Sequence, residues 1–173
     1  MIPHRHPPED VLLSYAAGGL PEPVALLVAT HLTLCPPCRA QCDDFVTLGG
    51  VILEGTAGDP VSSQCLERTL ARLDAEDERP ADPTAPPAFP SASLPQPLAR
   101  YLPGARPSLP WRRIGNRIAE IRLLRRYPGF TTRLVRVTEG TRIVRHSHDG
   151  LELTLVLAGG YSCGSEPFRA GDF

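Results

Sequence analysis

Three potential metal ligands lie close together near the amino end of the sequence, namely His31, Cys35 and Cys38. A helix over residues 24–34 would place His31 and Cys35 on one face, because residues four apart lie one turn above each other. The two prolines between the cysteines then force the chain to turn, which brings Cys38 round to face Cys35. One imidazole and two thiols that converge on a point are typical of a tetrahedral structural zinc site.

The fourth ligand of such a site has to come from another part of the chain. His4 and His6 can each supply it, and the sequence does not separate them. Cys35-Pro36-Pro37-Cys38 is also plausible as a thioredoxin-like redox pair, but that motif follows a strand, whereas a helical, histidine-bearing segment precedes this one. Zinc binding is therefore the favoured interpretation. Release of zinc on oxidation, with a disulfide between Cys35 and Cys38, is a further hypothesis compatible with it.

The residues around this site predict a small all-helical domain over residues 1–78. Acidic residues open the first helix, prolines fit the first turns of the second and third, and a serine caps the fourth. The four predicted helices cover about residues 9–17, 21–34, 36–54 and 64–78. A unit this small buries little core, so a metal that joins its helices would stabilise it.

The predicted fourth helix carries Leu66, Leu70 and Leu73 at positions i, i+4 and i+7, which form one apolar stripe. Small helical units expose apolar faces, and such faces bind partners. The stripe is therefore a candidate partner-binding surface. Ordinary packing on the first three helices explains the same pattern equally well, and the sequence leaves both interpretations open.

The remaining residues predict a linker followed by a second domain. Half of the chain's prolines lie in residues 79–110, which are expected to form a semi-rigid, extended linker. From residue 111 the apolar pattern changes to short runs with regular turns, which favours an antiparallel sandwich or barrel over residues 111–173. The predicted strands cover residues 121–127, 132–137 and 151–157.

A second group of potential ligands lies at the start of the last predicted strand. His146 and His148 are two apart and would point the same way from an extended segment, and Glu152 follows just inside the strand. Two imidazoles and a carboxylate suit zinc, iron, manganese or nickel. A polar loop and strand end without a metal is the alternative interpretation.

The spacing Gly140-x5-His146-x-His148-x3-Glu152-x6-Gly159 resembles the first signature motif of the cupin barrels. Residues 169–173 look like the turn that opens the second cupin motif. The later strands, and the further histidine that usually completes the metal site, are expected to be absent. The predicted fold class is therefore two-domain, α plus all-β, with a small zinc-stapled helical bundle followed by a truncated cupin-like antiparallel β-barrel.

Both halves together resemble the ChrR type of zinc-binding anti-sigma factors. The resemblance is most specific around His6 and residues 12–18, in residues 28–35, and in residues 148–157. It implies zinc ligands His6, His31, Cys35 and Cys38, and a second divalent metal at His146, His148 and Glu152. It also implies that the helical domain sequesters an extracytoplasmic-function sigma factor, while the cupin-like domain senses stress, here expected to be oxidative, and controls release.

Composition narrows the remaining classes of protein. A formal charge of −1 argues against a surface that coats nucleic acid, and no apolar run approaches the roughly 20 residues of a membrane span. Five cysteines without the spacing of a disulfide framework favour a reducing compartment. We therefore expect a cytoplasmic protein with no direct contact with nucleic acid or membrane.

The runner-up hypothesis is a cupin-class metalloenzyme, such as an oxygenase or isomerase, with the helical part as an accessory module. An enzyme of this kind needs an acid or base besides the metal ligands. Residues 111–173 offer no convincing candidate beyond His146, His148 and Glu152. The sequence therefore predicts a regulator and not an enzyme.

Overall fold

The computed structural model describes residues 3–77, 94–102, 109–143 and 150–173. Its helices are α1 (Glu9–Ala16), α2 (Glu22–Leu34), α3 (Pro36–Glu54), α4 (Cys65–Asp77) and the short α5 (Gln96–Ala99). Its strands are β1 (Arg112–Ile114), β2 (Ile118–Leu123), β3 (Thr132–Val137), β4 (Gly160–Cys163) and β5 (Glu166–Arg169). The four long helices agree closely with the predicted ranges.

Local sequence explains where the first three helices begin and end. α1 opens with Glu9 and Asp10, which suit the positive end of the helix dipole, and it closes at Gly18, whose φ of 70° is easy for glycine. Prolines occupy the first turns of α2 and α3, where the missing N–H is not needed. Cys35 lies between α2 and α3 in an extended conformation, with φ −122° and ψ 96°. One residue therefore makes the sharp bend between the two helices.

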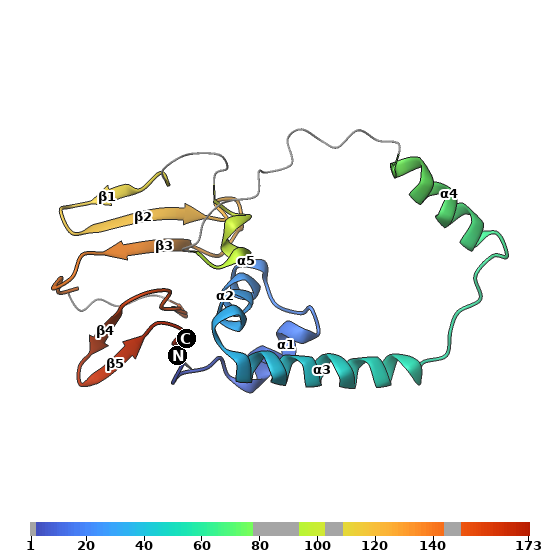
Figure 1. Ribbon diagram of the computed structural model, residues 1–173, viewed down its shortest axis with the longest axis horizontal. Coiled ribbons are helices and arrows are strands. Elements are labelled where there is room, and N and C mark those ends of the chain that lie inside the picture. The colour runs from blue at the N-terminus through green and yellow to red at the C-terminus, as the bar shows by residue number, and fades with distance from the viewer. Residues whose placement is uncertain (1–2, 78–93, 103–108, 144–149) are drawn as a thin grey trace.

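α2 forms a wall shared by two apolar cores. Its residue Val28 is buried with Leu12 of α1 and with Cys42 of α3. Its residue Leu26 is buried in the other core with Leu98 of α5 and Ile121 of β2. A helix that carries apolar residues on most of its surface has to be covered on more than one side. Figure 1 shows α2 between the other helices and the β-strands.

The strands form two separate antiparallel units. β1, β2 and β3 make one sheet in that order, with Ile118 opposite Val137 and Leu123 opposite Thr132 at the two ends of the β2–β3 ladder. β4 and β5 make a hairpin joined by Gly164 and Ser165, and the φ of 62° at Gly164 fits a tight two-residue turn. The described strands do not close into a barrel.

Two of the predicted strands are wrong in place or in kind. β2 ends at Leu123, earlier than the predicted end at residue 127, because Leu124 adopts a φ of 48° that no strand continues through. Residues 151–157 form no strand ladder among the described residues. Within this segment, the backbone of Val156 exchanges hydrogen bonds with Gly171 and Asp172. These two bonds are not extended by neighbouring residues into a ladder.

The predicted linker also contains packed structure. α5 lies within residues 79–110, and Leu98 and Leu102 are buried against α2 and β2. The Tyr101 hydroxyl donates a hydrogen bond of 2.8 Å to the Glu22 carboxylate at the start of α2. The carboxyl end of the linker range is therefore part of the core between the helices and the sheet. Residues 78–93 and 103–108 lie outside the described part.

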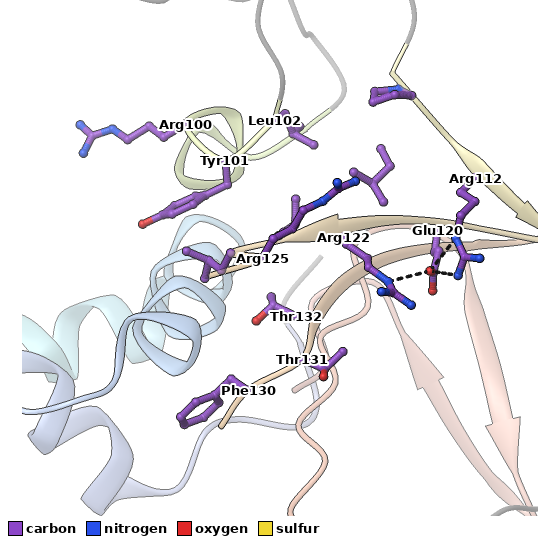
Figure 2. A pocket seen from close by; sticks show the side chains of 14 residues that line it. Arg100, Tyr101, Leu102, Arg112, Glu120, Arg122, Arg125, Phe130, Thr131 and Thr132 are labelled. Carbon is purple, nitrogen blue, oxygen red and sulfur yellow. Dashed lines mark hydrogen bonds and ion pairs between the residues drawn. The ribbon is translucent and has the colours of Figure 1, made fainter. Parts of the chain in front are cut away.

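Glu120 on β2 is a buried carboxylate surrounded by arginines. Arg112 of β1 and Arg122 of β2 both bond to its Oε1 atom, and Arg133 of β3 lies 3.6 Å from Oε2. Figure 2 shows Glu120 between Arg112 and Arg122 beside the pocket that they help to line. The hydrogen bond from Arg112 leads the effects that hold the pKa of Glu120 below its usual value, and it outweighs burial, which alone would raise it. Glu120 is therefore charged at neutral pH, and its ion pairs join residues of all three strands.

We predict that Glu120→Gln destabilises the sheet in a pH-dependent way. A lowered pKa contributes stability above the carboxyl's ordinary pKa, and this contribution is lost as the pH falls through the lowered value. The variant should therefore unfold more easily than the wild type at pH 7, with the difference shrinking in acid. Denaturant unfolding followed at several pH values measures this. Glu166→Gln, at an exposed pair with Arg5, is the matched control and should change little. A difference that stays constant down to acid pH would contradict the role of the charge.

Candidate metal centre

Four potential ligands come together where α2 meets α3. The ligand atoms of His6, His31, Cys35 and Cys38 all lie within 4.8 Å of one another. His6 Nδ1 is 3.3 Å from the sulfur of Cys35 and 3.3 Å from that of Cys38. A tetrahedral zinc ion separates a nitrogen ligand from a sulfur ligand by about 3.6 Å. The cluster is therefore close to the size that a metal ion requires.

Each ligand reaches the cluster from a different piece of local structure. His31 lies in the last turn of α2, Cys35 makes the bend between α2 and α3, and Cys38 lies in the first turn of α3. His6 comes from the segment before α1, between the buried Pro3 and Pro7. The sequence left His4 and His6 unseparated, and the structure brings His6 into the cluster.

His31 shows most clearly that the cluster suits a metal. It is fully buried, and its Nδ1 atom bonds the carbonyl oxygen of Gly171 at 2.8 Å. A carbonyl only accepts, so Nδ1 carries the proton and the neutral ring directs the lone pair of Nε2 towards the cluster. Nε2 is buried without a hydrogen-bond partner. Buried polar atoms are rarely left unpaired, and a metal ion held by the cluster would satisfy this one.

The titration behaviour of the cluster agrees with that interpretation. Desolvation by burial lowers the pKa of His31, which keeps the imidazole in the neutral form that binds metals. Burial, followed by the neighbouring Cys35 thiol, raises the pKa of Cys38 to about 12. A thiol in this position becomes a thiolate when a divalent cation lies beside it, because the cation removes the cost of the buried negative charge.

The other cysteines stay outside the cluster. Cys42 is buried one turn after Cys38, with its sulfur 4.0 Å from the carbonyl oxygen of Leu12, and it packs in the helical core as a neutral thiol. Cys65 is partly exposed and Cys163 is exposed. A helix precedes Cys35, so the strand that a thioredoxin-like motif requires is not there.

The second predicted metal site is described only at one end. His146 and His148 lie outside the described residues. Glu152 is described and lies at the surface, in the irregular segment that leads to Val156. The ligand set His146, His148 and Glu152 therefore stays a prediction.

The apolar stripe of α4 is exposed. Leu66, Leu70 and Leu73 keep 70%, 50% and 56% of their surface accessible to solvent. Figure 1 shows α4 apart from the other helices, so the interpretation of the stripe as packing on the first three helices is wrong. Sequence reasoning missed a second apolar surface on the carboxyl half of α3, formed by Val46, Leu48, Val51, Ile52 and Leu53. These apolar residues are spread around the helix and do not form one stripe. Because a helix packed on one side needs only one apolar stripe, this spread could have indicated an exposed apolar surface.

Comparison with known proteins gives this geometry a context. The sequence is 39% identical over 174 residues to the anti-sigma-E factor ChrR of Cereibacter sphaeroides, covering 97% of this chain and 77% of that protein. The structure matches that of Rhodobacter sphaeroides SigE in complex with the anti-sigma ChrR, with a TM-score of 0.76 and 35% identity, over 99% of this chain and 85% of the matched chain. No family model matches the sequence. The chain belongs to the ChrR family of anti-sigma factors.

Membership of the ChrR family decides between the two main hypotheses. It identifies the protein as a regulator of transcription, and it removes the basis for a cupin-class metalloenzyme. The helices and antiparallel strands of the chain match the ChrR structure as a whole. No helix in the described part of the chain is long and apolar enough to cross a membrane.

We predict that Cys38→Ser and Cys42→Ser affect metal binding very differently. Cys38→Ser removes a soft ligand from the cluster, so zinc affinity should fall by more than the roughly 10- to 100-fold that loss of an outer-shell partner costs. Cys42→Ser changes a buried thiol in the same helix that points elsewhere, and it should leave affinity unchanged. Competition with a chromophoric chelator measures both values. Equal losses in the two variants would show that helix damage, and not ligation, explains the effect.

Proposed function

We propose that this protein sequesters an extracytoplasmic-function sigma factor through the exposed apolar faces of α3 and α4. Family membership carries the proposal, because a ChrR relative is known in complex with SigE. The exposed leucines of α4 support it, since unpaired apolar stripes on helices bind grooves or helices of partner proteins. A sigma factor bound to these faces would have its own contacting surface covered, and that surface could not then bind RNA polymerase.

The proposed resident metal is zinc, held by His6, His31, Cys35 and Cys38. Two imidazole nitrogens and two thiolates form the ligand set of structural zinc sites. When bound, zinc would supply a cross-link and no catalytic chemistry. The four residues would then fix the segment before α1 to the junction of α2 and α3, from which α3 projects towards its partner surface.

The proposed role of the β region is to sense stress, here oxidative stress, and to control release of the sigma factor. His146, His148 and Glu152 would bind a second divalent metal in a cupin-like domain over residues 111–173. The antiparallel strands and their contacts with α2 support a domain that can influence the helices. The helical domain would comprise residues 1–78, and the core contributed by α5 suggests that the connection, residues 79–110, is only partly a linker.

We predict that Leu70→Glu abolishes tight binding of the sigma factor without affecting metal content. In the complex the partner would bury this apolar stripe. A charge in its middle should cost as much binding free energy as truncation of a hot-spot residue, so affinity for the sigma factor should fall roughly thirtyfold or more. Arg68→Glu places the same charge on the opposite side of α4 and is the matched control. Co-purification and titration calorimetry with the cognate sigma factor measure both variants. Unchanged binding by Leu70→Glu would exclude α4 as the partner surface.

A further inference from the structure

The turn of residues 169–172 after β5 holds the segment that carries His6. Asp172 is only 1% exposed, and its Oδ1 atom accepts hydrogen bonds from the backbone N–H groups of His4 at 2.7 Å and Arg5 at 3.1 Å. Its Oδ2 atom accepts a third from the N–H of Arg169 at 2.8 Å. A buried carboxylate with three N–H donors is firmly fixed. The amino-terminal segment is thus fastened to a turn that lies about 168 positions away in the sequence.

The same turn orients a second ligand of the cluster. The carbonyl oxygen of Gly171 accepts the hydrogen bond from His31 Nδ1, which leaves Nε2 as the atom facing the other ligands. Partners of this kind fix the tautomer and the ring angle of a metal-binding histidine. The ring of Phe173 lies edge-on to His31, with 5.9 Å between ring centres, and limits its rotation. Two of the four ligands therefore depend on residues next to β5.

The contact between the turn and the amino-terminal segment is close. Gly171 has a φ of 94°, and a Cβ atom built on it would lie 2.5 Å from Cγ of Pro3. A side chain at this position would both strain the backbone and displace Pro3. The β4–β5 hairpin adds an ion pair of 2.8 Å between Glu166 and Arg5, whose guanidinium also lies over the Phe168 ring. The segment that carries His6 is held along its length by the β region.

We propose that the 169–172 turn is a positioning element of the metal centre, through which the β region sets how tightly the helical region holds its metal. Asp172 positions His6, and Gly171 positions His31. The proposal rests on metal binding by the cluster, as proposed above. Because Gly171 and Asp172 also bond Val156, any rearrangement of the β region that moves this turn loosens two ligands together.

The test uses the full chain and measures zinc release. Asp172→Ala leaves the N–H groups of His4 and Arg5 without acceptor, so transfer of zinc to a chromophoric chelator should become about 10- to 100-fold more favourable. Asp172→Asn keeps an acceptor at Oδ1 and should lie between Asp172→Ala and the wild type. Glu120→Gln lowers the stability of the β1–β3 sheet and makes no contact with the turn, so it is the control for destabilisation alone. Under conditions in which this variant stays folded, it should release zinc like the wild type.

Cobalt substitution separates positioning from general damage. Absorption of cobalt bound to thiolates and imidazoles reports ligand geometry, so Asp172→Ala and Gly171→Ala should shift the visible spectrum while Glu120→Gln leaves it unchanged. The proposal would be overturned if a folded Asp172→Ala chain released zinc like the wild type and had the wild-type cobalt spectrum. If Asp172→Ala does not fold, the same two measurements on Gly171→Ala test the proposal. A wild-type chain that binds neither zinc nor cobalt would overturn the proposed metal centre itself, and this proposal with it.

Discussion

The hydrogen bond from His31 to the carbonyl of Gly171 connects the two halves of the structure at the candidate metal centre. It places the proton on Nδ1 and leaves Nε2 of a fully buried imidazole facing two thiols and a second imidazole. The last turn of α2 is therefore constrained on one side by the β region and on the other by the cluster. If the Gly171 carbonyl moved away, the buried Nδ1 atom of His31 would lose its hydrogen-bond partner, which costs about 1–3 kcal/mol.

α2 carries this constraint into the rest of the fold. Its residues enter both apolar cores, so the helical cluster and the three-stranded sheet share one element and do not pack as independent units. The amino-terminal segment adds a second connection through Asp172. A displacement of the β region would therefore reach the ligand cluster directly, through α2 and through the amino-terminal segment.

Local patterns in the sequence were enough to predict the helices and the first cluster. The spacing of His31, Cys35 and Cys38 specifies a bend between two helices, and proline and glycine mark the helix ends, so short-range physics decides these features. The strands were less predictable, because pairing depends on residues that lie far apart in the sequence. Within residues 151–157, Val156 exchanges backbone hydrogen bonds with Gly171 and Asp172, and no ladder forms there among the described residues.

Long-range contacts account for the remaining differences between prediction and structure. Nothing near Asp172 in the sequence indicates that its carboxylate holds the backbone of His4 and Arg5. Spacing alone also gave no reason to place His6, and not His4, in the cluster. Leu98 was assigned to a linker because its neighbours are prolines, yet it is buried against α2. Tertiary burial overrides local composition at each of these positions.

The isolation of α4 has a consequence for how readily a complex can be taken apart. A helix of 13 residues is marginal in water unless other groups cover it, because tertiary packing supplies most helix stability. Whatever covers Leu66, Leu70 and Leu73 therefore has to stabilise the helix as well as contact it. If α4 is part of the interface, some of the gross interaction energy is spent on ordering the helix, and the complex would be weaker than its buried area suggests. Such a helix would make the complex easier to reverse.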